Sequence, residues 1–226
     1  EFQKEKYLKP LLNGEKRVCY SMTEKAAGAD ATGMRTTAVK DGNSNYIMNG
    51  EKWFSSAASA ADLAVVMART DPDAPRHRQF STFIVELPNP GYIIKRDIKT
   101  MAIEGPLSQV MGGGHSEIEI KDLVVPAENL LGGEGNGFNM GQHRLAYGRL
   151  RHGMHNVAMA QRALDLATAH VTQRETFGKR LSDRQGVQFM LAECASELYM
   201  ARLMLLHIAY KAEKGMDLRQ ENSIAK

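Results

Sequence analysis

Residues 187 to 212 read VQFMLAECASELYMARLMLLHIAYKA, and this stretch decides the fold of the second half of the chain. Its apolar residues recur at alternating steps of four and three, which lays them along one face of an α-helix of roughly seven turns. The members of this face are Val187, Leu191, Cys194, Leu198, Ala201, Leu205, Ile208 and Ala212. An apolar face of this length predicts a helix packed in a bundle.

Sequence signals mark both ends of this helix. Ser182 and Gln185, three residues apart, have the spacing of a capping box. Gly215 stands where a left-handed residue would end the helix. A second long helix is expected after Gly137, because apolar residues again recur at near-helical spacing. The short connection 174–181 predicts that the two helices run antiparallel.

The first half of the chain has a different period. From about Val18 to Val125, short runs of β-branched and apolar residues alternate with clusters of Gly, Asp, Asn and Pro. The expected strands are 34–40 and 45–50 around the turn 41–44, then 63–69, 80–86 and 116–121. We therefore predict an α+β fold, with a small antiparallel β-barrel or sandwich domain followed by long antiparallel helices.

Composition limits the classes of function. The chain has 226 residues, 43% hydrophobic and 24% charged, which is ordinary for one or two globular domains. The two cysteines lie in segments of different type, so no disulfide framework is indicated and a reducing compartment is favoured. The net charge of +3 is not gathered into a basic stripe, which gives nucleic-acid binding little support.

Other classes of site lack their sequence signals. No stretch approaches the roughly 20 apolar residues of a membrane span, and the first residues lack the apolar run of a signal peptide. No pair of cysteines or histidines has zinc-ligand spacing. We expect a protein without a membrane span or a metal site.

Three segments carry side chains that suit a planar or anionic ligand. Residues 19–30 put small side chains after a short strand, although an ordinary strand-to-turn transition fits as well. Trp53 and Ser55 could offer a ring and a hydroxyl to one ligand, but a lone tryptophan is also typical of a core. Residues 174–180 gather cations that suit a pyrophosphate, with a solvated turn as the alternative.

In this order, the segments resemble the acyl-CoA dehydrogenase family across nearly the whole chain. The matching segments are CYSMTE at 19–24 with Gly28 and Asp30, NGEKW at 49–53, VPAENLLG at 125–132, GEGNGF at 133–138, and RETFGK at 174–179 with Gln185. No single segment is diagnostic, so the ordered series carries the resemblance. Residues 73–80 and 147–152 are similar to the branch whose eukaryotic members are fused to a phosphotransferase domain.

The resemblance implies three domains. Residues 1–17 would end an N-terminal helical domain that is largely absent from this chain. Residues 18–130 would form the middle β domain, and residues 131–226 would form part of a C-terminal four-helix bundle. We expect the chain to be part of a longer polypeptide.

The implied chemistry is flavin-dependent α,β-dehydrogenation of an acyl-CoA thioester to the trans-2-enoyl-CoA. A carboxylate would remove the α proton while the β hydrogen leaves as hydride to FAD. The implied partners are an electron-transfer flavoprotein and further copies of the chain, as a tetramer or dimer, in a bacterial cytoplasm or the mitochondrial matrix. An acyl-CoA oxidase, another flavin enzyme on this scaffold and a non-catalytic flavin-binding member stay open as alternatives.

The resemblance also assigns site residues. Those expected to bind FAD in their own protomer are Tyr20, Met22, Thr23, Gly28, Ala29, Trp53 and Ser55. Those matching residues that reach the FAD of a neighbouring subunit are Arg174, Thr176, Phe177 and Gln185. For substrate, Arg149 matches an arginine near the acyl-CoA cavity. Arg76, His77 and Arg78 are a hypothetical site for the 3′-phosphate of CoA, with a solvated loop as an equal alternative.

Three positions depart from the family pattern. Lys25 stands where many members have proline, and Ala29 stands where many have serine, so one hydrogen bond is unaccounted for. Gly148 matches a position where some members carry the catalytic glutamate, and glycine cannot act as a base. We therefore expect no catalytic residue within this chain and place the base beyond Lys226.

Overall fold

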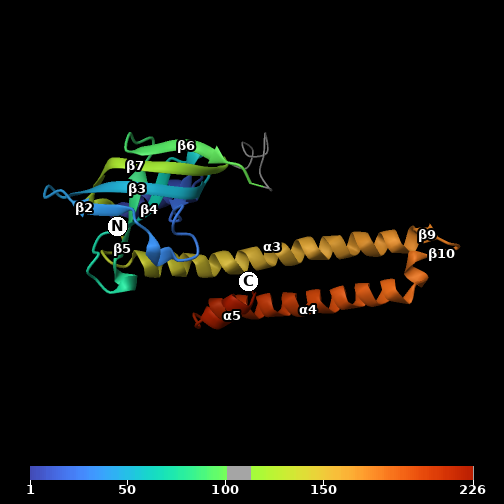
Figure 1. Cartoon of the computed structure of the whole chain (residues 1–226). Helices are drawn as coiled ribbons and strands as arrows, with labels where there is room; N and C mark the ends of the chain where they lie inside the picture. The colour runs from blue at the N-terminus through green and yellow to red at the C-terminus, as the bar shows by residue number, and fades with distance from the viewer. Residues whose placement is uncertain (101–112, 226) are drawn as a thin grey trace. The chain divides into compact units, whose positions relative to one another are not determined.

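The structure is a computed structural model that describes residues 1–100 and 113–225. The chain divides into two compact units, Glu1–Gly141 and Gln142–Lys226. Figure 1 shows the strands of the first unit and the long helices of the second. The first unit opens with the short helices η1 (Lys4–Leu8) and α1 (Lys9–Leu12).

The described part of the first unit is built on one sheet of eight strands, in the order β6-β7-β3-β2-β4-β5-β8 with β1 paired to β4. The strands are β1 (Val18–Ser21), β2 (Thr37–Lys40), β3 (Asn45–Ser56), β4 (Leu63–Arg69), β5 (Phe80–Glu86), β6 (Tyr92–Ile98), β7 (His115–Pro126) and β8 (Leu130–Leu131). Short 3-10 turns between them are η2 (Ala31–Gly33), η3 (Ala58–Ala60), η4 (Arg76–Arg78) and η5 (Ala127–Asn129). The predictions for 63–69 and 80–86 are confirmed to the residue.

Two strand pairs differ from the antiparallel arrangement that we expected. β1 runs parallel to β4, with Val18 opposite Leu63, and β2 makes one parallel pairing to β4, with Thr37 opposite Arg69. The other pairs of the sheet are antiparallel. The difference arises because side chains alternate with the same period in both kinds of strand pair, so the pattern alone does not give strand direction.

The main core of the first unit draws on alternate residues of these strands. Tyr46 and Phe83 are both buried within it, and their rings meet edge to face with centroids 4.8 Å apart. A smaller cluster on another face of the strands contains Ala27, Met34, Met67 and Phe80, with Tyr20, Met22 and Phe138 packed against it. This smaller cluster holds the end of β1 in place.

The second unit contains two long helices. α3 spans Gly137–Gln173 and therefore begins in the first unit, and α4 spans Gln185–Glu213. The hairpin of β9 (Glu175–Thr176) and β10 (Lys179–Arg180) and the turn η6 (Leu181–Asp183) join them, and α5 (Arg219–Ala225) follows. Figure 1 shows α3 and α4 running antiparallel, as predicted. Arg202 Nη2 on α4 donates to Gln161 Oε1 on α3 at 3.0 Å.

The predicted capping box of α4 is wrong. Ser182 lies inside η6, and the N-cap is Arg184, whose side chain makes no cap bond. The backbone carbonyl of Ser182 instead accepts a bond from Gln188 Nε2 at 2.8 Å.

The predicted end of α4 is confirmed. Gly215 has a φ of +66°, and its N–H donates to the carbonyl of Ala212. The N–H of Met216 donates to the carbonyl of Lys211. These two bonds form a Schellman motif, which requires the left-handed backbone that glycine adopts without strain.

Close packing at the start of α3 requires a glycine. A Cβ at Gly137 would lie 2.7 Å from the backbone carbon of Ser81, whereas a Cβ at Gly148 in the same helix would meet nothing within 4 Å. We expect Gly137→Ala to lower the free energy of unfolding by about 1–3 kcal/mol. Gly148→Ala should raise it by about 0.5–1 kcal/mol. Urea unfolding of the two variants checks this, and equal midpoints would contradict the packing at Gly137.

Candidate functional site

Side chains at the end of β1 point alternately toward the main core and toward the smaller cluster. Cys19 belongs to the main core and Ser21 is fully buried, while Tyr20 and Met22 pack on the smaller cluster. This follows from the alternation of side chains along a strand. Tyr20, Met22 and the next residue, Thr23, are half-buried. These three predicted site residues therefore lie together at the end of β1.

A buried ion pair fixes this segment against β3. Lys52 Nζ lies 2.9 Å from Glu24 Oε1, and the side chains are 0% and 2% exposed. Lys52 Nζ also donates to the carbonyl of Met22 at 3.1 Å. Both carboxylate oxygens of Glu24 accept backbone N–H groups, from Arg35 at 2.6 Å and from Thr36 at 3.0 Å. Such additional hydrogen bonds are what make a buried ion pair tolerable.

Burial and pairing shift the pKa values of both members of this pair. Burial lowers the pKa of Lys52 to about 8, although the attraction of Glu24 opposes that shift. Burial also acts to raise the pKa of Glu24, but the Lys52 ammonium and hydrogen bonds from Thr36 and Arg35 hold the pKa below its usual value. Both groups are therefore ionised at neutral pH.

Trp53 is the next residue after Lys52 in the sequence. It is half-buried, and its backbone N–H donates to the carbonyl of Thr23 at 2.7 Å. The next residue, Phe54, has a left-handed φ of +55°, and the register of β3 against β7 shifts between Lys52 and Ser55. A bulge of this kind redirects side chains along a strand. The structure thus brings Trp53 beside the segment that follows β1.

Ser55 belongs to a buried chain of hydroxyl groups. Its Oγ lies 2.8 Å from Ser21 Oγ, which lies 2.8 Å from Tyr92 Oη. Burial raises the pKa of Tyr92, so its hydroxyl stays protonated. We missed Ser21 and Tyr92 in the sequence, although Ser21 stands between two residues that we assigned. The assignment of Ser55 to the cofactor stays a prediction.

The other residues predicted in the first unit lie in turns. Gly28 and Ala29 are exposed, just before the turn η2. Arg76 in η4 donates to both carboxylate oxygens of Asp30, at 3.1 and 3.0 Å, and to Thr32 Oγ1 at 2.6 Å. These contacts tie η4 to the segment before β2.

His77 and Arg78 complete η4. The ring of His77 stacks on Phe138 with centroids 4.6 Å apart and an interplanar angle of 10°. Both His77 and Arg78 are exposed. The assignment of η4 to the substrate stays a prediction.

The hairpin between α3 and α4 presents an aromatic ring to solvent. Phe177 is 98% exposed with a φ of +51°, and Gly178 follows with a φ of +70°. Two left-handed residues in a two-residue loop are typical of a type I′ turn. Arg184 Nη2 donates to the carbonyl of Thr176 at 2.6 Å and to its Oγ1 at 3.2 Å, a contact that we did not predict. Arg184 Cζ also lies 5.9 Å from the centroid of the Phe177 ring.

The remaining predicted positions lie on the two long helices and near their junction. Arg174 and Gln185 are exposed beside the hairpin, whereas Arg149 on α3 is half-buried. Within residues 1–100 and 113–225, no helix is long and apolar enough to cross a membrane. In the same residues, no three His, Cys, Asp or Glu side chains form a group that could hold a metal ion.

Two family descriptions match the chain. "Acyl-CoA dehydrogenase, middle domain" matches residues 19–122, and "Acyl-CoA dehydrogenase, C-terminal domain" matches residues 135–226. The chain belongs to the acyl-CoA dehydrogenase family, whose members are FAD-binding oxidoreductases. The fold predicted from the resemblance is confirmed by solved structures of the family.

Individual relatives agree with this assignment. The chain is 39% identical over 217 residues to "Acyl-CoA dehydrogenase family member 11" of Gallus gallus, covering 94% of this chain and 27% of that protein. It is 37% identical over 226 residues to "Caffeyl-CoA reductase-Etf complex subunit CarC" of Acetobacterium woodii, covering 100% of this chain and 57% of that protein. The crystal structure of acyl-CoA dehydrogenase from Geobacillus kaustophilus has a TM-score of 0.90 and 37% identity, over 100% of this chain and 58% of that chain.

Two conclusions follow from these relatives. The predicted similarity to the branch that includes family member 11 is confirmed. The chain spans between 27% and 58% of the length of these relatives.

The ion pair of Lys52 and Glu24 can be tested by a double-mutant cycle. Lys52→Met keeps the aliphatic length but leaves the Glu24 carboxylate buried without its cation, so we expect a loss of about 3–5 kcal/mol in the free energy of unfolding. The Glu24→Gln/Lys52→Met variant should lose less than the sum of the two single variants. Urea unfolding of all four proteins measures the coupling, and additive losses would mean that the pair is not coupled.

Proposed function

We propose that this chain supplies the flavin-binding part of an enzyme that oxidises an acyl-CoA thioester to the trans-2-enoyl-CoA. One observation carries the proposal: Tyr20, Met22 and Thr23 lie at the end of β1, and the bond from Trp53 N–H to the Thr23 carbonyl joins this segment to β3. This arrangement agrees with the family to which the chain belongs.

The side chains at the end of β1 and that of Trp53 have the chemistry to bind FAD. Trp53 offers a half-buried aromatic surface, and Thr23 offers a half-buried hydroxyl beside it. A Cβ at Gly28 would meet nothing within 4 Å, so there is open space in the turn that follows. Bound FAD would supply the hydride acceptor for the β hydrogen of the substrate. The protein side chains would hold the ring system flat, orient its polar edge and exclude water from one face.

We propose that the hairpin of the second unit completes the FAD site of another copy of the chain. Arg174 and Gln185 are exposed, Thr176 is half-buried, and Phe177 is almost fully exposed at the tip. A ring held out in a left-handed turn has little reason to persist unless a partner covers it. The functional form would then be a homo-oligomer, either a dimer or a tetramer.

The electron acceptor that we propose is an electron-transfer flavoprotein. The relative from Acetobacterium woodii is named as a subunit of an Etf complex, which supports this choice. The proposed location is the bacterial cytoplasm or the mitochondrial matrix, where such acceptors work.

We propose that η4 and Arg149 contact the CoA part of the substrate. Arg78 is exposed, and the stack of His77 on Phe138 holds η4 against the first turn of α3. Arg76 is already bonded to Asp30, so we expect it to contribute less than Arg78 to binding a phosphate. Guanidinium groups suit this role because they bind phosphate oxygens in forked geometry.

The flavin proposal predicts a visible spectrum. The full-length protein that contains this chain should take up FAD, turn yellow and lose that colour when an acyl-CoA substrate is added without oxygen. Phe177→Ala should weaken FAD binding by about tenfold, because it removes one stacking surface. Glu175→Ala, in the same hairpin, is the matched control and should bind FAD like the parent. A colourless protein that ignores added FAD would refute the proposal.

The CoA proposal predicts unequal effects at two neighbouring arginines. In the FAD-loaded full-length protein, Arg78→Ala should raise KM for acyl-CoA by roughly tenfold with little change in kcat, because a charge-assisted bond to a phosphate contributes about equally before and during the reaction. Arg76→Ala should raise KM less. Steady-state kinetics with one acyl-CoA decides this, and an unchanged KM in the double variant would remove η4 from the substrate site.

A further inference from the structure

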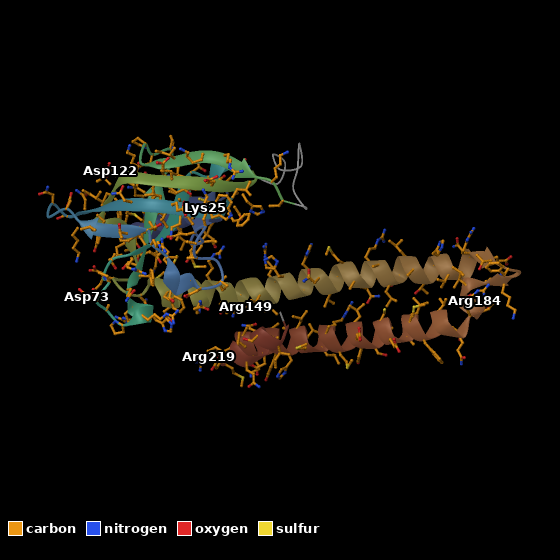
Figure 2. All side chains as sticks on the ribbon, in the orientation of Figure 1. Lys25, Asp73, Asp122, Arg149, Arg184 and Arg219 are labelled. Carbon is orange, nitrogen blue, oxygen red and sulfur yellow. The ribbon has the colours of Figure 1, made fainter. Side chains whose placement is uncertain are left out.

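Two cations lie against the indole ring of Trp53. Lys25 Nζ is 4.8 Å from the ring centroid, and Arg96 Cζ is 5.5 Å from it. Figure 2 labels Lys25 on the strand-rich unit. Trp53 is only half-buried, so core packing alone does not determine the orientation of its ring. Cations at these distances attract the face of an aromatic ring.

One carboxylate holds both cations. Glu117 Oε2 accepts a bond from Arg96 Nε at 2.7 Å, and Glu117 Oε1 accepts one from Lys25 Nζ. Arg96 on β6 and Glu117 on β7 are directly opposite each other in the sheet. Lys25 arrives from the segment after β1, so the carboxylate joins three separate parts of the unit.

Glu117 has the least exposed side chain of this cluster. The side chain of Glu117 is 15% exposed, whereas those of Lys25 and Arg96 are 48% and 57% exposed. Hydrogen bonds from Lys25 and Arg96 hold the pKa of Glu117 below its usual value, so the group remains an anion at neutral pH. Without it, Arg96 would lose its carboxylate partner, and Lys25 would keep only the longer contact of its Nζ with Glu51 Oε2 at 4.0 Å. Isolated surface contacts of this kind are weak.

We propose that Glu117 is a positioning residue for the flavin site, because it clamps Lys25 and Arg96 against the ring of Trp53 and so fixes the orientation of that ring. The inference rests on the proposed function, in which Trp53 forms the aromatic surface for FAD. A ring that is already held in one orientation loses less freedom when a flat ligand stacks on it.

The chain offers a matched control on the same strand. Glu119 stands two residues after Glu117 on β7, and its carboxylate bonds Lys95 Nζ at 2.8 Å. Glu117→Gln and Glu119→Gln therefore remove the same charge from the same face of one strand. They differ in that Glu117→Gln removes the carboxylate shared by the two cations that lie on Trp53.

Trp53 is the only tryptophan of the chain, so its fluorescence reports on this ring alone. In the protein without FAD, Glu117→Gln should increase quenching by acrylamide and lower the fluorescence anisotropy, while Glu119→Gln should match the parent. The dissociation constant for FAD should rise roughly two- to fivefold in Glu117→Gln, which is the size of effect expected from losing a surface cation–π contact. Lys25→Met keeps an apolar stem over the ring but removes one cation, and its changes should be smaller.

The outcomes separate the clamp from the proposed function. Unchanged quenching and anisotropy in Glu117→Gln would overturn the clamp even if FAD binds. A more mobile ring with unchanged FAD affinity would overturn the positioning role. A parent protein that binds no FAD would overturn the proposed function, and with it the role of Trp53 in the site, while the fluorescence would still report whether Glu117 holds the ring.

Discussion

The arrangement of the first unit depends on the ion pair between Lys52 and Glu24. Two charges are taken out of water, and they are tolerated because backbone groups of two segments bond to them. Those groups are the Met22 carbonyl after β1 and the Arg35 and Thr36 N–H groups before β2. The pair therefore joins β3 to the two segments that approach it, and Trp53 is the next residue along that strand.

The candidate flavin site follows from this constraint. Trp53 is held from one side by its backbone bond to Thr23 and carries the cations of Lys25 and Arg96 on its ring. The buried ion pair thus fixes the position of the Trp53 ring, and the surface cluster around Glu117 fixes its orientation. The ring of Phe177 in the hairpin of the second unit also has a cation near it, Arg184 Cζ at 5.9 Å from the centroid, but it is almost fully exposed. This exposure is compatible with the proposed contribution of the hairpin to the FAD site of another protomer.

The parts of the fold that depend on periodicity could be predicted from the sequence. The helix at 187–212 and the strands at 63–69 and 80–86 have patterns long enough to be unambiguous. The capping box at Ser182 was wrong because its signature is local, and here a 3-10 turn occupies that position. The parallel pairing of β1 with β4 depends on chain direction across many residues, which no local pattern records.

The residues of the candidate site could be predicted only in part. The family resemblance contributed more to that prediction than the residue patterns did. Trp53 and Thr23 were assigned in this way and do lie together. Lys52 and Glu24 were not assigned, because a charged residue in a sequence is expected at the surface and only the fold shows that these two are buried as a pair.

The most direct test of this account is the FAD affinity of the Glu24→Gln/Lys52→Met variant. Removing both charges together should leave the chain folded but weaken the attachment of Met22 and Thr23 to β3. We predict a clearly weaker affinity for FAD in a variant whose unfolding remains cooperative. A folded double variant that binds FAD as tightly as the parent would show that the ion pair does not position the site.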